Sequence, residues 1–209
     1  MKTAQKRYLI TIATSTMFLL VNQWAAAGDP QKGQEKSAVC QGCHGPDGNS
    51  LGPDWPNLAS QNASYIQKQA TDFQDGKRQD PTMSSMVIGL SKEDIADIAA
   101  YFSSQNLQPT TAEESQANSD AALGKKIYKG GNTYNDVPAC AGCHGPNGVG
   151  NGPAVFPRIA GQKNTYLVKA LNDFKSGVRS NDPNEIMRNI ATKLSDREIK
   201  AVAAYASSM

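Results

Sequence analysis

Two copies of a five-residue Cys-x-x-Cys-His pattern constrain this chain more than any other feature. The copies lie at 40–44 and 140–144, and together they use all four Cys and both His of the 209 residues. The pattern is typical of covalent haem c attachment. On a helix, residues at i, i+3 and i+4 project from one face, so two thiols can reach both vinyl groups of one porphyrin while the imidazole stands beneath its iron. We therefore expect two haem c groups, with His44 and His144 as iron ligands. The thiols that would attach them are Cys40, Cys43, Cys140 and Cys143.

Paired cysteines also serve other chemistries, which context must separate from haem attachment. A disulfide or thioredoxin-like redox pair usually lacks the following His and lies on a strand–loop–helix pattern, which this chain does not show. A structural zinc site requires four ligands, whereas each cluster offers three. Neighbouring side chains such as Cys43 and His44 also wrap poorly around one tetrahedral ion. Haem attachment is the favoured interpretation, with these as its alternatives.

The two motifs belong to an internal repeat that continues well beyond them. Gly45–Gly48 (Gly-Pro-Asp-Gly) corresponds to Gly145–Gly148 (Gly-Pro-Asn-Gly), and the register later shifts by a few inserted residues. Self-similarity of this kind predicts a tandem duplication. Further matched pairs are Gln61 with Gln162, Tyr65 with Tyr166, Arg78 with Arg179 and Met83 with Met187.

The repeat sets the expected domain boundaries. We expect one domain at 28–106 and a second at 120–209. Between them, the segment 107–119 is polar and contains hardly any apolar residue, which is typical of a linker.

The first 27 residues are expected to be a signal peptide rather than part of the fold. They combine basic residues at 2–7, a mostly apolar stretch Tyr8–Val21 and the small residues Ala25–Ala27. The apolar stretch is shorter than the roughly 20 residues that a spanning helix needs. We therefore predict removal after Ala27 and export to the periplasm, with a retained membrane anchor as the alternative.

Capping signals and apolar spacing predict helices throughout both units. Asp29 and Pro30 should open a helix that runs into His44. A second helix is predicted over roughly 62–75. Ser91 and Ser195 each begin a capping-box pattern, followed by an apolar stripe at helical spacing. Because no run of residues alternates between apolar and polar, the predicted class is all-α.

The second axial ligand decides what each iron can do. Since both His are already assigned, the soft donors left after residue 27 are Met residues. Met83 and Met187 match in the repeat, each eight positions before a capping Ser, and we expect them to bind iron. Met86 matches Ile190 instead, which predicts an apolar packing position. A Met near a helix is often packing alone, which is the alternative for the matched pair as well.

These features together resemble the dihaem cytochrome c4 family, in which two class I cytochrome c domains follow one another. The similarity rests on the paired motifs, the Gly-Pro-Asp/Asn-Gly loops, the late Met residues and two matching segments, Trp55–Leu58 and Phe156–Ile159. It covers essentially all of the chain after residue 27. It implies two small helical bundles, each around one covalently bound haem c.

The resemblance also implies roles for other residues. Pro56 and Pro157 would offer their carbonyls to the Nδ1 protons of the axial His, although a simple turn proline is the alternative. The first and last helices of each unit would cross through a small residue and an aromatic one. Those positions are Gly33 and Tyr101 in the first unit, where Ser37 replaces an expected aromatic, and Gly124, Tyr128 and Tyr205 in the second. The repeated Gln, Tyr and Arg pairs would either reach haem propionates or simply pack and cap helices.

A six-coordinate iron predicts an electron carrier rather than an enzyme. With His and Met on its two sides, the iron has no free position for a substrate, so we assign no catalytic residue. The resemblance implies a periplasmic respiratory carrier between an upstream reductase or dehydrogenase and a downstream terminal oxidase or reductase, and it allows peripheral membrane association. A cytochrome subunit of a larger dehydrogenase or oxidase complex is the alternative, and a haem peroxidase is a weaker one.

Charge excludes one class of partner and suggests another. The net charge of +2 is too balanced for a nucleic-acid binder. Residues 28–108 contain 6 Lys and Arg against 10 Asp and Glu, whereas 109–209 contain 12 against 9. Such asymmetry can steer encounters with charged redox partners. Ordinary solvated surface charge is the alternative.

Overall fold

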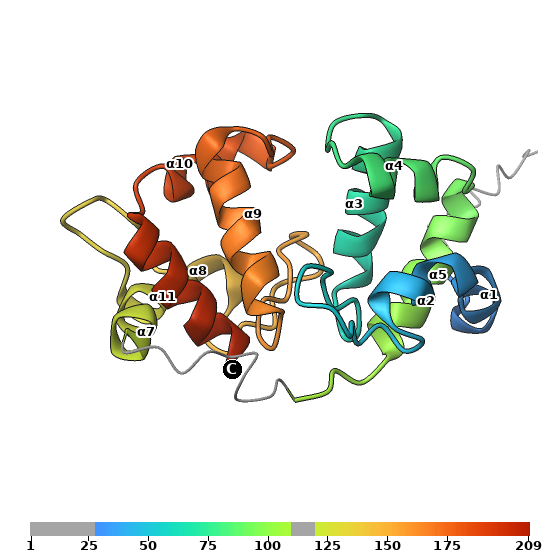
Figure 1. The fold of residues 1–209 in the computed structure, drawn as a ribbon, viewed down its shortest axis with the longest axis horizontal. Helices are drawn as coiled ribbons and strands as arrows, with labels where there is room; N and C mark the ends of the chain where they lie inside the picture. Colours follow the sequence, from blue (N-terminus) through green and yellow to red (C-terminus); the bar gives the residue numbers. More distant parts are fainter. Residues whose placement is uncertain (1–27, 110–119) are drawn as a thin grey trace, which may run out of the picture.

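A computed structural model describes residues 28–109 and 120–209. Within them the chain forms two helical units side by side, and α3 and α9 are the helices of each unit that face the other unit (Figure 1). The helices of the N-terminal unit are α1 (Pro30–Lys36), α2 (Ala38–His44), α3 (Ala63–Gln74), α4 (Pro81–Val87) and α5 (Lys92–Ser104).

The C-terminal unit repeats this order with small differences. Its segments are α7 (Ala121–Gly130), α8 (Ala141–His144), α9 (Asn164–Ser176), the short 3-10 helix η1 (Pro183–Glu185), α10 (Ile186–Ala191) and α11 (Asp196–Ser207). In the described part of the chain, β structure is limited to two isolated bridges, Asn132–Val137 and Asn151–Phe156. The predicted all-α class is confirmed.

The predicted helix starts after Asp29, Ser91 and Ser195 are confirmed, and each has a capping side chain. The Asp29 carboxylate accepts hydrogen bonds from the backbone N–H groups of Gln31 and Lys32, and so caps α1. Ser91 and Ser195 each form a complete capping box, at the starts of α5 and α11. These caps satisfy N–H groups that a helix leaves without partners in its first turn.

One predicted helix is broken in the structure. The sequence predicts a continuous helix from Pro30 to His44, but the chain divides it at Ser37 into α1 and α2. The buried Ser37 hydroxyl donates to Gln34 O at 2.8 Å and accepts from Gln41 Nε2 at 3.0 Å. A Ser side chain that bonds nearby backbone competes with the helical ladder, which accounts for the break.

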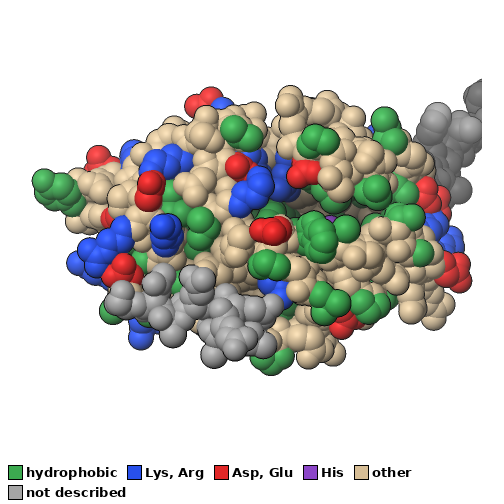
Figure 2. All heavy atoms as spheres, in the orientation of Figure 1, with side chains coloured by type: hydrophobic (Ala, Val, Ile, Leu, Met, Phe, Trp, Pro, Cys, Tyr) green, Lys and Arg blue, Asp and Glu red, His purple; other side chains and the backbone are tan. Residues whose placement is uncertain are grey.

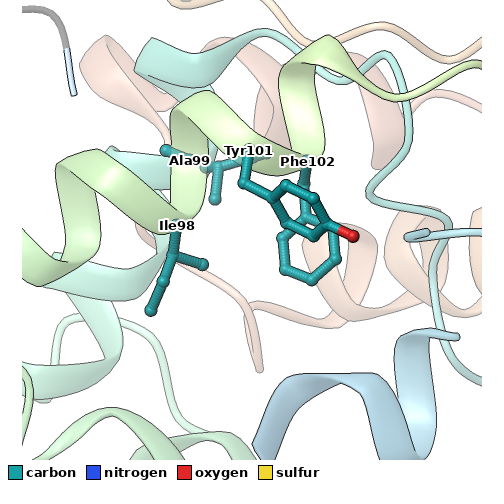
Figure 3. Close-up of a cluster of buried hydrophobic side chains, with 5 residues drawn as sticks. Ile98, Ala99, Tyr101 and Phe102 are labelled. Carbon is teal, nitrogen blue, oxygen red and sulfur yellow. The ribbon is translucent and has the colours of Figure 1, made fainter. Parts of the chain in front are cut away.

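Each unit has its own apolar core beside its Cys-x-x-Cys-His helix. In the N-terminal unit, α5 contributes Ile98, Ala99, Tyr101 and Phe102, whose two rings lie 5.1 Å apart between centroids (Figure 3). Cys40 packs against this cluster. In the C-terminal unit, the cluster at the corresponding positions comprises Leu167, Ala203 and Ala206, and a second cluster comprises Ile127, Val137, Leu194 and Ile199. The apolar stripes predicted on α5 and α11 are therefore buried, as expected.

Two predictions fall on parts of the chain outside this description. The signal peptide at 1–27 lies outside the described residues, and so does most of the linker at 107–119. Among the helices that the structure describes, none combines the length and the apolar character that crossing a bilayer requires.

Candidate haem-binding sites

The first site is built around a buried histidine at the end of α2. Gly45 leaves the helix with a φ of +81°, a conformation that glycine tolerates readily, and turns the chain into the Gly-Pro-Asp-Gly loop. Gly48 O then accepts hydrogen bonds from Leu58 N at 2.7 Å and Ala59 N at 3.0 Å. This contact brings the preceding segment back over the helix, where Pro56 O lies 2.8 Å from His44 Nδ1.

The second site reproduces this arrangement on α8. Gly148 O accepts from Ile159 N at 2.8 Å and Ala160 N at 3.0 Å. Pro157 O lies 2.9 Å from His144 Nδ1. Because a carbonyl oxygen only accepts, Nδ1 carries the proton in both rings, and Nε2 is the nitrogen left with a lone pair for a metal.

Burial keeps both imidazoles neutral. His44 and His144 are 5% and 9% exposed, and loss of hydration lowers the pKa of each ring. The proline carbonyl raises the pKa in each case, but the lowering by burial is larger. A neutral, oriented imidazole is the form that binds iron.

The first cysteine of each motif lacks the surroundings of a thioredoxin-like redox thiol. None of the four Cys forms a disulfide in the structure. Burial raises the pKa of the Cys40 thiol, and it raises the pKa of Cys140 to about 11. A thioredoxin-like pair requires the opposite shift, because the thiolate is the reactive form.

The two predicted Met ligands lie on equivalent short helices. Met83 is on α4, which the Asp80 carboxylate caps by accepting from the N–H groups of Thr82 and Met83. Met187 is on α10, and both residues are half-buried. In the N-terminal unit, α2 and α4 lie toward opposite ends of the α3–α5 pair (Figure 1). The expectation for Met86 is wrong, because its side chain is 46% exposed.

Each unit has a groove or hollow in its surface. In the C-terminal unit, a groove of about 600 Å³ separates α10 from the segment that leads into Cys140. It is lined by apolar Val137, Pro138, Ile186 and Ile190 and by polar Thr133, Asp136, Asn189 and Lys193, and no predicted haem ligand is among them. In the N-terminal unit, a hollow in the surface exposes a small area of His side chain (Figure 2). The donors present, two thiols, one imidazole and a thioether per unit, are those that a haem c requires, so the residues fit the group.

The repeated Tyr and Arg residues do something that the sequence did not predict. Arg179 Nη2 donates to Tyr65 OH at 2.8 Å, and Arg78 Nη2 donates to Tyr166 OH at 3.2 Å. Both contacts join one unit to the other. Burial raises the pKa of Tyr166, but the guanidinium charges of Arg78 and Arg179 outweigh burial and lower it. Asn57, to which the sequence assigned no role, also lies in this interface and donates from Nδ2 to Gly161 O at 3.0 Å.

Fold and site together define a tandem c-type cytochrome. The family model for cytochrome c matches residues 30–106 and 121–209. A cytochrome c4 from Pseudomonas aeruginosa is 46% identical over 181 residues, which are 86% of this chain and 88% of that protein. The chain therefore belongs to the cytochrome c family, among its dihaem cytochromes c4. It is an electron-transfer protein with two haem c groups.

Two further relatives agree with this membership. The crystal structure of reduced recombinant cytochrome c4 from Pseudomonas stutzeri is similar with a TM-score of 0.80 and 42% sequence identity, covering 88% of this chain and all of that one. A thiosulfate dehydrogenase electron acceptor from Stutzerimonas stutzeri is 37% identical, over 90% of this chain and 89% of that protein.

Proposed function

We propose that the protein is a periplasmic electron carrier of a respiratory chain, delivering electrons toward a terminal oxidase or reductase. The observation that carries the proposal is the matched pair of buried histidines, each held through Nδ1 by a proline carbonyl. This arrangement would leave the Nε2 lone pair available to a metal and would fix the ring before the metal binds. A ligand field that does not rearrange on changing oxidation state suits a carrier better than an enzyme.

The proposed ligand sets follow the repeat. Haem 1 would be attached to Cys40 and Cys43, and its iron held by His44 and Met83. Haem 2 would be attached to Cys140 and Cys143, and its iron held by His144 and Met187. When bound, each haem supplies a one-electron couple, and His/Met ligation raises its reduction potential. The chain's own residues orient each imidazole through the carbonyls of Pro56 and Pro157.

Export and domain organisation complete the proposal. Residues 1–27 would act as a signal peptide removed after Ala27, which places the protein in the periplasm. The haem-binding units would be 28–106 and 120–209, joined by the linker 107–119. The basic residues and the small-residue end of segment 1–27 support the signal peptide. The polar composition of residues 107–119 supports the division into two units.

A redox titration of the purified holoprotein, followed by visible spectra, tests the function. We expect two haems per chain in a pyridine haemochrome assay, and in the oxidised protein the far-red charge-transfer band of Met-bound ferric haem. One haem per chain, or oxidised spectra without this band, would contradict the proposal. Ready binding of carbon monoxide to the reduced protein would show that an axial position is vacant or easily vacated by Met, and would favour a haem enzyme.

A second candidate function is that of a cytochrome subunit within a larger dehydrogenase complex. It is favoured by the relative from Stutzerimonas stutzeri, which is named for accepting electrons from a thiosulfate dehydrogenase. Purification from the native membrane and soluble fractions separates the two functions. A free carrier elutes at the size of one chain, whereas a subunit copurifies with a catalytic partner.

A further inference from the structure

Two glutamines at equivalent positions of the repeat reach across the interface between the units. Gln61 of the N-terminal unit accepts from Arg158 N at 2.8 Å through Oε1 and donates to Arg158 O at 2.9 Å through Nε2. Gln162 of the C-terminal unit accepts from Asn57 N at 2.7 Å and donates to Asn57 O at 2.9 Å. Each amide therefore pairs with the backbone of the other unit as a neighbouring β-strand would.

These two contacts end on the peptide units that hold the axial histidines. Pro56 O, which lies 2.8 Å from His44 Nδ1, belongs to the same peptide group as Asn57 N. Gln162 Oε1 accepts from that N–H. A continuous chain of hydrogen bonds thus runs from the His44 ring through one peptide unit to a side chain of the opposite domain.

The reciprocal chain has the same construction. Pro157 O lies 2.9 Å from His144 Nδ1 and shares its peptide group with Arg158 N. That N–H donates to Gln61 Oε1 at 2.8 Å. The two contacts are therefore reciprocal: each glutamine supports the histidine of the other unit.

The glutamine amides are held in one orientation. Besides its cross-domain donor, Gln61 Oε1 accepts from Asn62 N at 3.0 Å, and Gln162 Oε1 accepts from Lys163 N at 2.9 Å. Since two N–H groups point at each Oε1, the oxygen and nitrogen cannot exchange places. Both glutamines are 6% exposed, and such burial strengthens hydrogen bonds and the polarisation between them.

We propose that Gln61 is a positioning residue for His144, and Gln162 for His44, so that each domain tunes the axial histidine of the other. This inference rests on the proposed ligation of iron by the two histidines. An N–H that donates to glutamine makes the carbonyl of its own peptide a stronger acceptor. A stronger acceptor at Nδ1 makes the imidazole a more electron-rich ligand, which stabilises the oxidised iron. Loss of either glutamine should therefore raise the potential of the haem in the opposite unit.

The two histidines make a direct test feasible. Because the chain contains only two His, labelling with ¹⁵N-histidine marks just the two axial rings of the reduced, diamagnetic holoprotein. We compare the wild type with Gln162→Leu and Gln61→Leu. Gln162→Leu should shift the Nδ1–H signal of His44 upfield, as its hydrogen bond weakens, and leave that of His144 in place. Gln61→Leu should do the reverse, and in each variant the potential of the opposite haem should rise.

Two matched variants separate this role from simple stabilisation of the interface. Ser64→Ala removes another cross-domain hydrogen bond, from Ser64 Oγ to Gly152 O at 2.6 Å, that does not involve either histidine. It should leave both His signals and both potentials unchanged. Gln162→Glu keeps an oxygen that accepts from Asn57 N, and should hold the His44 signal at its wild-type position or move it downfield.

The results that would overturn the inference are specific. The first is a shifted Nδ1–H signal of the histidine in the mutated unit instead of the opposite one, and the second is an equal shift of both signals. The third is a shift in Ser64→Ala as large as that in Gln162→Leu. If Leu variants do not fold, the Glu variant decides, and an upfield shift of His44 in it would contradict the inference. Failure of the proposed function would show itself separately, in a wild-type protein whose His rings carry no signature of iron ligation.

Discussion

A β-carbon placed on Gly124 would lie 2.1 Å from the carbonyl oxygen of Ala201, so α7 and α11 cross with their backbones in contact. The same β-carbon would lie 2.9 Å from Tyr205 Cβ. The obstacle is backbone, which cannot move aside as a flexible side chain can. We expect Gly124→Ala to destabilise the holoprotein by about 1–3 kcal/mol, as overpacking does. That cost exceeds the roughly 1 kcal/mol that Ala gains over Gly in a helix.

Thermal unfolding of the holoprotein measures this effect, and α7 itself offers a control. A β-carbon on Gly130, at the end of the same helix, would meet no atom within 4 Å. Gly130→Ala should therefore leave the unfolding midpoint unchanged or raise it slightly. Equal midpoints for Gly124→Ala and the wild type would show that the helices can separate without cost.

Asp97 should make the N-terminal unit sensitive to acid. Its nearly buried carboxylate accepts from Lys36 Nζ at 2.8 Å and from Asp29 N at 2.7 Å. The Lys36 contact, and then the Asp29 N–H, lower the pKa of Asp97 in the folded protein. The unfolded chain consequently binds a proton more readily, so this contribution to stability is present above the ordinary carboxyl pKa and is lost as the pH falls through the folded value. Asp97→Asn should lower stability at neutral pH and flatten the loss in acid.

Circular dichroism of thermal unfolding, at pH values from neutral to below about pH 4, follows this loss. Asp75→Asn is the control, because Asp75 and Lys77 form an exposed pair, and such pairs contribute little. If Asp97→Asn and the wild type lose stability in parallel as the pH falls, the assignment to Asp97 is wrong.

The local features of this fold could be predicted from sequence because their causes are local. The boxes at Ser91 and Ser195 depend on residues three positions apart. The His–Pro contacts followed from the family resemblance, and the structure places both at hydrogen-bond distance. The division at Ser37 is different in kind, since it depends on how a hydroxyl competes with the helix once the residue is buried.

The interface between the units could not be predicted in the same way. Gln61 and Gln162 were visible as a repeated pair, but a repeat reports equivalence within each unit and not how the units face one another. The contact of Gln162 with Asn57 joins residues 105 positions apart in the chain. Met86 shows that equivalence in the repeat does not fix burial either. Its match with Ile190 predicted a packed side chain, whereas the structure leaves it exposed.

Replacement of a proposed axial Met should affect one haem only. In Met187→Ala, the second iron would lose its thioether, and its potential should fall because His/Met ligation is what raises it. The far-red band of the oxidised protein should lose about half its intensity, since one of two proposed Met-bound irons is changed. The reduced variant should also bind carbon monoxide at one haem per chain.

Met86→Ala is the matched control for the axial ligands. Met86 lies on α4 with Met83, three positions further along the helix, and is exposed. Its removal should leave the spectrum and both potentials as they are. A spectrum unchanged in Met187→Ala, or a band lost in Met86→Ala, would require another assignment of the sulfur ligands.

The uneven charge should make electron transfer depend on salt. Figure 2 shows most Lys and Arg side chains of the face drawn there over the C-terminal unit. If this unit meets an acidic partner, the second-order rate constant should fall as ionic strength rises, because screening shortens the reach of charges to about 8 Å at physiological salt. Replacing the exposed Lys125 and Lys126 by Glu should slow the reaction at low salt and reduce its salt dependence, whereas Lys92→Glu in the other unit should do neither. Stopped-flow kinetics with an acidic redox protein measure these rate constants. If they change neither with ionic strength nor with the double substitution, the charges are ordinary solvated surface charges.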